Sequence, residues 1–222
     1  MGLAYREGSD VCHALRGVRL GLRGPAFVGI VGPSGSGKSS LLYVLAGLKR
    51  ATSGRVLALG QDLGRLGPSE RCALRRRHFG FVFQQPLLIR FLTARENLLA
   101  GSLRVDRAAR ERASELLAAL GLEGLGHRLP HQLSGGQRQR VAVGRALMNN
   151  PLVICADEPT AALDHATALE LMALLHEYRR RHGALLLVVT HDETMLSGSD
   201  AVVRMWDGRV DQVQQGAASA SG

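Results

Sequence analysis

A glycine-rich segment between an apolar strand and a helix is the feature that most limits how this chain can fold. The segment, called the phosphate loop below, reads Gly32-Pro33-Ser34-Gly35-Ser36-Gly37-Lys38-Ser39. It directly follows the apolar run at residues 27–31 and directly precedes the helix-like stretch at residues 40–45. A strand, a GxxxxGK[ST] loop and a helix in this order predict a phosphate-binding loop at the edge of a sheet.

The side chains of the phosphate loop indicate what it binds. Glycines let backbone N–H groups turn toward phosphate oxygens, and the helix N-terminus adds the positive end of its dipole. Lys38 can bridge the β- and γ-phosphates of ATP, and the hydroxyl of Ser39 is a hard oxygen ligand suited to Mg²⁺. An ordinary glycine-rich turn is the structural alternative.

A second apolar strand, at residues 152–156, ends in two acidic residues. Continuous apolar strands are typical of a parallel sheet that is covered on both faces. Asp157 can hold the Mg²⁺ shell, and the adjacent Glu158 can polarise a water molecule for attack on the γ-phosphate. Taken alone, the two acids could equally cap a turn before Pro159.

A third motif lies far from the phosphate loop along the chain. It reads Gln132-Leu133-Ser134-Gly135-Gly136-Gln137-Arg138-Gln139-Arg140-Val141-Ala142. This segment resembles the signature sequence of ATP-binding-cassette (ABC) ATPases. Ser134 is a good N-cap, and the two glycines expose N–H groups at the start of an amphipathic helix, which makes a second anion site. The resemblance implies that this site completes the ATP pocket of the opposite subunit in a head-to-tail dimer.

Further positions match the ABC family one by one. Gln84 resembles the glutamine that touches Mg²⁺ and links ATP to the transport partner. Asp164 resembles the aspartate that crosses the dimer interface, and His191 resembles the histidine that contacts the γ-phosphate. Tyr5 lies where the family often has an aromatic residue that stacks on adenine, but it could equally pack on its own sheet. Ser40 stands where the family usually has threonine, and it keeps a hydroxyl.

The prediction for the site therefore has three parts. The predicted catalytic residues are Glu158, His191 and Lys38. The predicted Mg²⁺ ligands are Ser39, Gln84 and Asp157. The predicted ATP-binding residues are Tyr5, Gly32, Pro33, Ser34, Gly35, Ser36, Gly37, Lys38, Ser39, Ser40, Gln84, Ser134, Gly135, Gly136, Gln137 and Asp164.

The order of these patterns predicts an α/β fold. We expect a P-loop NTPase core with a parallel sheet, a small antiparallel β subdomain and a helical signature subdomain at about residues 87–148. Residues 1–222 are expected to form a single ABC ATPase domain. Residues 206–209 are expected to form a hairpin turn. The small polar tail at about residues 212–222 is predicted to be disordered.

The expected location is the cytoplasmic face of the cell membrane, as a peripheral protein. The longest apolar runs are far below the roughly 18 residues that a spanning helix needs. Charged residues at Arg6, Glu7 and Asp10 interrupt any apolar region of a secretory signal.

The expected partners follow from a narrower likeness within the family. Residues 81–84, 92–98 and 129–137 are similar to the short cassettes of lipoprotein-releasing and macrolide-exporter-type permeases. That likeness implies a homodimer or paired cassette acting on an integral membrane permease. It also implies ATP-driven export, extraction or mechanical signalling, and not solute import.

The net charge of +9 allows several interpretations. The runs at residues 75–78 and 179–182 could contact nucleic acid or anionic lipid. We favour a solvated, arginine-rich surface, because charge runs usually face water, and we expect no nucleic acid partner. A soluble cassette ATPase that acts on DNA or ribosomes stays open. A third alternative, a metabolic P-loop kinase, would account for Lys38 and Asp157 but not for the signature.

Overall fold

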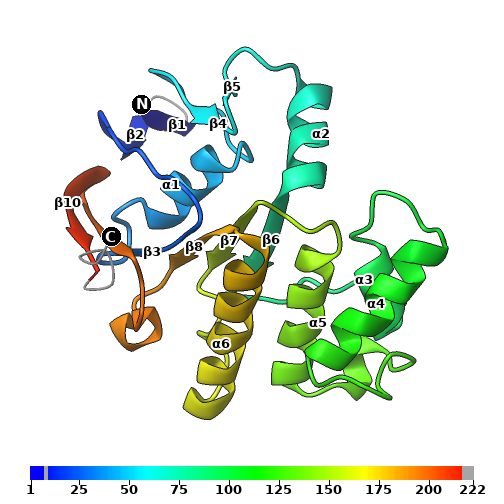
Figure 1. The fold of residues 1–222 in the computed structure, drawn as a ribbon. Coiled ribbons are helices and arrows are strands. Elements are labelled where there is room, and N and C mark those ends of the chain that lie inside the picture. The colour runs from blue at the N-terminus through cyan, green and yellow to red at the C-terminus, as the bar shows by residue number, and fades with distance from the viewer. Residues whose placement is uncertain (8–9, 217–222) are drawn as a thin grey trace.

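A six-stranded sheet forms the centre of the computed structural model, which describes residues 1–7 and 10–216 (Figure 1). The strand order is β10-β9-β3-β8-β7-β6, and every neighbouring pair is parallel except the β9–β10 hairpin. The strands are β3 (Ala26–Val31), β6 (Phe79–Phe83), β7 (Val153–Asp157), β8 (Leu185–Val189), β9 (Ala201–Trp206) and β10 (Arg209–Gln215). The predicted parallel core is confirmed.

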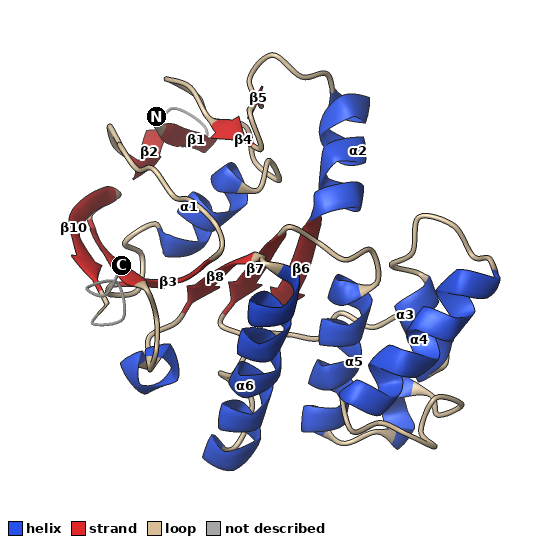
Figure 2. Ribbon diagram, viewed as in Figure 1, coloured by secondary structure: helices blue, strands red, loops and turns tan. Residues whose placement is uncertain are grey.

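Helices cover both faces of this sheet (Figure 2). They are α1 (Lys38–Leu45), α2 (Pro68–His78), α3 (Ala94–Leu99), α4 (Arg107–Ala119), α5 (Gly135–Leu147) and α6 (His165–His182), with short 3-10 helices η1 (Pro130–Gln132) and η2 (Glu193–Leu196). Helix α1 lies on one face, and α5 and α6 lie on the other. Within residues 1–7 and 10–216, no helix combines the length and apolar character needed to cross a bilayer.

The two faces of the sheet bury two separate apolar cores. In β7, Ile154 packs into the core that holds α5 and α6, while its neighbour Cys155 packs into the core that holds α1. Successive side chains of a strand point to opposite faces, so a strand covered on both faces must be apolar throughout. This explains why the central strands read as continuous apolar runs.

The smaller subdomains flank the central sheet. Two antiparallel sheets, β1 (Leu3–Glu7) with β2 (Asp10–Leu15) and β4 (Leu57–Ala58) with β5 (Gln61–Asp62), lie near α1 (Figure 1). Helices α3, α4 and α5 all fall within residues 87–148. Helix α2 was not predicted, although Gly67 before Pro68 is a helix-start signal, because proline fits the first helical position.

The prediction for the C-terminal tail was wrong for residues 212–215. These residues belong to β10, which pairs with β9 from Arg209–Trp206 to Gln215–Ala201. An edge strand needs only backbone pairing on one side, so a polar sequence can form one. Gly216 follows the strand, and its N–H donates to the carbonyl oxygen of Asp200 at 2.7 Å. Residues 217–222 of the predicted tail lie outside the described residues. The predicted hairpin turn is confirmed, since only Asp207 and Gly208 separate the two strands.

Candidate functional site

Four predicted segments leave the sheet at the same edge. The registers of β3 with β8, β8 with β7 and β7 with β6 place the carboxyl ends of these parallel strands side by side. The predicted residues that follow these ends are Gly32, Gln84, Glu158 and His191. Open parallel sheets bind their ligands at this edge. Segments that are far apart in the sequence therefore meet where a nucleotide is expected.

The phosphate loop has the backbone shape that its glycines allow. Gly32 has a φ of 146°, and a Cβ atom there would lie 2.3 Å from the carbonyl oxygen of Met205. Gly37 has a φ of 95°, and a Cβ atom there would lie 2.4 Å from the carbonyl oxygen of Ala14. A side chain at either position would force the loop out of this shape. Ser36 is buried, whereas the loop tip is exposed.

Lys38 folds back over the loop that precedes it. Its ammonium donates hydrogen bonds to the carbonyl oxygens of Gly32, at 2.8 Å, and Pro33, at 2.9 Å. These are the bonds that phosphate oxygens can replace, with a gain from opposite charge. The geometry fits an anion held between the ammonium and the backbone N–H groups of the loop.

Asp157 lies at the end of β7 and accepts two hydrogen bonds from α1. The hydroxyl of Ser39 donates to its Oδ1 at 2.8 Å, and the phenol of Tyr43 donates to its Oδ2 at 2.6 Å. Burial first, and then the Asp157 carboxylate, raises the pKa of Tyr43 well above its usual value, so the phenol stays a donor. The adjoining hydroxyl and carboxylate oxygens fit the ligand preference of Mg²⁺.

Glu158 has an unusual backbone conformation for a residue with a side chain. Its φ is 50°, and its N–H donates to the carbonyl oxygen of Val189 at 2.9 Å. Its carboxylate lies 2.9 Å from Nδ1 of His191, which follows the neighbouring strand. A left-handed conformation that is fixed by the sheet is a frequent mark of a functional site. The carboxylate and the imidazole can together orient a water molecule.

The signature, residues 133–137, forms a capped helix start as predicted. The hydroxyl of Ser134 accepts a bond from the N–H of Gln137 at 3.2 Å, and the Gln137 side chain accepts one from the N–H of Ser134 at 2.9 Å. A Cβ atom at Gly136 would lie 2.8 Å from the side chain of Thr167. The N–H of Thr167 in turn donates a hydrogen bond to the Asp164 carboxylate at 3.0 Å. The signature and the predicted Asp164 therefore lie in one neighbourhood.

The signature and the phosphate loop belong to different parts of the molecule. The loop leads into α1 on one face of the sheet, and the signature begins α5 on the other (Figure 1). Across residues 1–7 and 10–216, no hydrogen bond or ion pair joins residues 134–137 to residues 32–40. The structure brings together the phosphate loop, Asp157, Glu158 and His191, but not the signature.

Two predicted residues lie at the margins of this site. Gln84 is exposed at the end of β6. Tyr5 is partly buried on β1, where Lys49 Nζ donates to its hydroxyl at 2.8 Å and lies 4.4 Å from the ring centroid. Stacking of adenine on Tyr5 stays a prediction.

Gln139 is a residue that the sequence analysis missed. It is 2% exposed on α5, and its amide Nε2 donates to the carbonyl oxygens of Phe83, at 2.8 Å, and Pro159, at 2.9 Å. Phe83 directly precedes Gln84, and Pro159 directly follows Glu158. One side chain thus ties the signature helix to two segments of the sheet edge. Tyr43 was also missed, although it follows Ser39 by four residues on one helix face.

Replacing Gln139 with Leu is expected to lower the free energy of unfolding by about 1–3 kcal/mol, because two buried carbonyl groups lose their donor. Leucine also removes an amide oxygen that has no partner within the described residues, which offsets part of this cost. Urea unfolding would measure the change, with Gln61→Leu on the exposed strand β5 as control. Equal stability of Gln139→Leu and the parent chain would show that the two bonds contribute no more than the unpaired amide oxygen costs.

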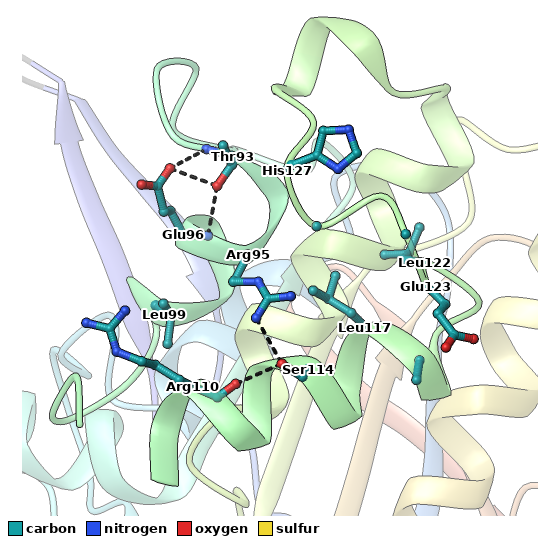
Figure 3. Close-up of a pocket in the computed structure, with 13 residues that line it drawn as sticks. Thr93, Arg95, Glu96, Leu99, Arg110, Ser114, Leu117, Leu122, Glu123 and His127 are labelled. Atoms are coloured by element: carbon teal, nitrogen blue, oxygen red, sulfur yellow. Dashed lines mark hydrogen bonds between the residues drawn. The ribbon is translucent and has the colours of Figure 1, made fainter. Parts of the chain in front are cut away.

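A hollow in the surface of the described residues lies away from the sheet edge. It has a volume of about 610 Å³ and is lined by α3, α4 and residues 122–127 (Figure 3). Leu99, Leu117 and Leu122 supply apolar side chains, and Arg95 is tethered to Ser114 by a hydrogen bond of 3.0 Å. This hollow contains none of the predicted nucleotide-binding residues.

Comparisons with known proteins agree with this geometry. Residues 15–161 match the family model described as ABC transporter. The chain is 44% identical over 212 residues to the macrolide export ATP-binding/permease protein MacB of Escherichia coli K12, covering 93% of this chain and 32% of that protein. MacB of Shigella flexneri is 43% identical over 212 residues, which again cover 93% of this chain and 32% of that protein. The chain thus spans about a third of the length of these relatives.

Solved structures show the same fold. A dimeric post-hydrolysis state of the ATP-binding cassette MJ0796, bound to ADP and Pi, superposes with a TM-score of 0.89 at 38% identity, covering 96% of this chain and 95% of that one. A second dimeric structure of MJ0796, a bacterial ABC transporter cassette, matches this chain with the same TM-score, identity and coverage. The chain belongs to the ABC transporter family and is an ATPase cassette. This membership rules out the metabolic kinase alternative and favours a transporter over a nucleic acid ATPase.

Proposed function

We propose that this cassette is the ATP-hydrolysing subunit of an export-type ABC transporter, which dimerises on ATP and drives an integral membrane permease. The observation that carries the proposal is the sheet edge, where the phosphate loop, Asp157 and the Glu158–His191 pair meet. The likeness to relatives named as macrolide export proteins supports export, and the dimeric MJ0796 structures support the dimer.

Each predicted residue has a role in this proposal. Lys38 and the N–H groups of the phosphate loop hold the β- and γ-phosphates, and Tyr5 stacks on adenine. Ser39, Gln84 and Asp157 would hold Mg²⁺, which neutralises phosphate charge when bound. Glu158 accepts a proton from the attacking water, and His191 holds that carboxylate and contacts the γ-phosphate.

The signature acts on the other subunit of the dimer. Its exposed helix N-terminus can donate N–H groups to the γ-phosphate of an ATP that is held by the opposite phosphate loop. The position of the signature supports this arrangement, since it makes no bond to its own loop within the described chain. Asp164 lies beside the signature and would contact the same interface.

The segment after Gln84 is the proposed contact with the permease. Phe91 is 80% exposed and Leu87 is 58% exposed, and large apolar side chains exposed in one segment mark an interaction surface. Gln139 links the start of this segment to the signature helix. The movement that closes the dimer would therefore be transmitted through this segment to a membrane partner. The cassette would lie at the cytoplasmic face of the membrane.

Capture from native membranes tests the transporter. The Glu158→Gln chain with MgATP is expected to co-purify with an integral membrane protein, because slowed hydrolysis preserves the closed dimer. Adding Phe91→Ser should abolish this recovery, while Val213→Ser, which changes an apolar side chain that is 41% exposed on β10, should not. Recovery with ribosomes or DNA, or without any membrane protein, would instead support the soluble cassette.

A further inference from the structure

A hairpin turn lies directly behind the phosphate loop. Asp207 and Gly208 connect β9 to β10 with φ angles of 44° and 73°, which is the left-handed pair that a two-residue hairpin turn requires. The N–H of Gly208 donates to the carbonyl oxygen of Ser36 at 3.1 Å. Its carbonyl oxygen accepts from the N–H of Arg16 at 2.8 Å. One residue therefore joins the phosphate loop to the end of β2.

The bond to Ser36 fixes the direction of a neighbouring donor. The carbonyl of Ser36 and the N–H of Gly37 belong to the same peptide group, and in a trans peptide they point in opposite directions. The carbonyl points toward the hairpin turn, so the Gly37 N–H points away from it. An N–H group of a phosphate loop that faces away from the supporting structure is able to meet a phosphate oxygen.

The packing around this bond leaves little room for adjustment. A Cβ atom at Gly208 would lie 3.0 Å from the carbonyl oxygen of Ala14, the same atom that a Cβ atom at Gly37 would approach to 2.4 Å. The two glycines are neighbours, since that Cβ atom at Gly37 would lie 3.5 Å from the Cα of Gly208. A displacement of the turn must therefore move the loop.

We propose that the Asp207-Gly208 turn is a positioning element of the phosphate site, which holds the Ser36 carbonyl so that the Gly37 N–H is presented to the nucleotide. This inference rests on the proposed function, because it requires that the phosphate loop binds ATP and ADP. The exposed Arg16–Asp207 ion pair, at 3.4 Å, adds little to this support, because water screens it.

Gly208→Ala tests the proposal by displacing the turn. The added Cβ atom meets backbone at 3.0 Å, and the residue keeps a left-handed conformation that alanine disfavours. We expect the dissociation constant for MgADP and the KM for MgATP to rise about tenfold, the effect of losing one hydrogen bond to a charged group. The kcat at saturating MgATP should stay within about twofold, because the change affects bound substrate and transition state alike.

Gly60→Ala is the matched control. Leu59 and Gly60 form another two-residue hairpin turn, between β4 and β5, with φ angles of 51° and 78°. A Cβ atom at Gly60 would meet nothing within 4 Å, so this variant has the backbone strain without the collision. Its MgADP dissociation constant should match that of the parent chain. Unchanged binding by Gly208→Ala, or an equal loss in both variants, would overturn the inference.

A measurement on the unaltered chain covers the case in which Gly208→Ala does not fold. Coupling between two sites is reciprocal, so bound MgADP should slow hydrogen exchange of the Gly208 amide by about tenfold. The amide of Leu63, which donates to Val56 at 2.9 Å, serves as the remote reference. Exchange at Gly208 that does not respond to MgADP would overturn the inference. Failure of the parent chain to bind MgADP would instead refute the proposed function.

Discussion

Glu158→Gln is expected to slow ATP hydrolysis by about 10²- to 10⁴-fold, the usual loss when a general base is removed. Glutamine has nearly the same shape and can still bond to His191, but its amide cannot accept the proton of the attacking water. The backbone of residue 158, with its φ of 50° and its bond to Val189, does not depend on the carboxylate. The variant should therefore bind ATP normally and fail at the chemical step.

The stalled step has a second expected consequence. With hydrolysis blocked, MgATP should hold two subunits together, and light scattering after size exclusion should detect the mass of a dimer. Glu111→Gln, which changes an exposed acid on α4, should keep the rate and the mass of the parent chain. Full activity of Glu158→Gln would show that the catalytic base lies elsewhere.

Lys38→Ala is expected to weaken MgATP binding by about 10- to 100-fold, because a hydrogen bond between an ammonium and a phosphate is lost. Hydrolysis should fall by about 10²- to 10³-fold or more, since the same cation stabilises charge on the transferred phosphoryl group. Among residues 1–7 and 10–216, the ammonium bonds only to loop carbonyls, so its removal should leave the fold intact. Calorimetric titration with MgATP and a phosphate-release assay would measure the two effects.

Arg107→Ala is the matched control for the loss of a surface cation. Its side chain is 93% exposed and forms an ion pair with Glu111 on α4, remote from the sheet edge. It should change neither binding nor turnover. Normal nucleotide binding by Lys38→Ala would show that the phosphate loop does not hold the nucleotide, and the proposed function would lose its main support.

Local patterns predicted the parts of the site that depend on local geometry. The phosphate loop was predictable because a strand, glycines and a helix fix its shape within a few residues. The signature cap was predictable because Ser134 and Gln137 lie three residues apart on one turn. The ends of the apolar strands located Glu158 and His191, although the 2.9 Å contact between them follows only from the pairing of β7 with β8.

Long-range backbone contacts could not be predicted in the same way. Gln139 bonds to carbonyl groups of Phe83 and Pro159, and every residue carries such a group, so no side-chain pattern marks its partners. The same reason explains the wrong prediction for residues 212–215, which form a strand through backbone pairing with β9. Gly208 was predicted as a turn residue, but its bond to Ser36 connects segments that only the fold brings together.

Under the proposed function, the separation of the phosphate loop, which leads into α1, from the signature, which begins α5, determines how turnover depends on protein concentration. In the proposed dimer, each chain carries two half-sites and must meet another chain before either half works. The proposed ATPase is therefore bimolecular in dilute solution, and its turnover per chain falls on dilution. A permease that anchors two cassettes would replace this encounter with an effective concentration in the millimolar range. ATP hydrolysis would then be confined to assembled transporters, and unassembled cassettes would hydrolyse almost no ATP.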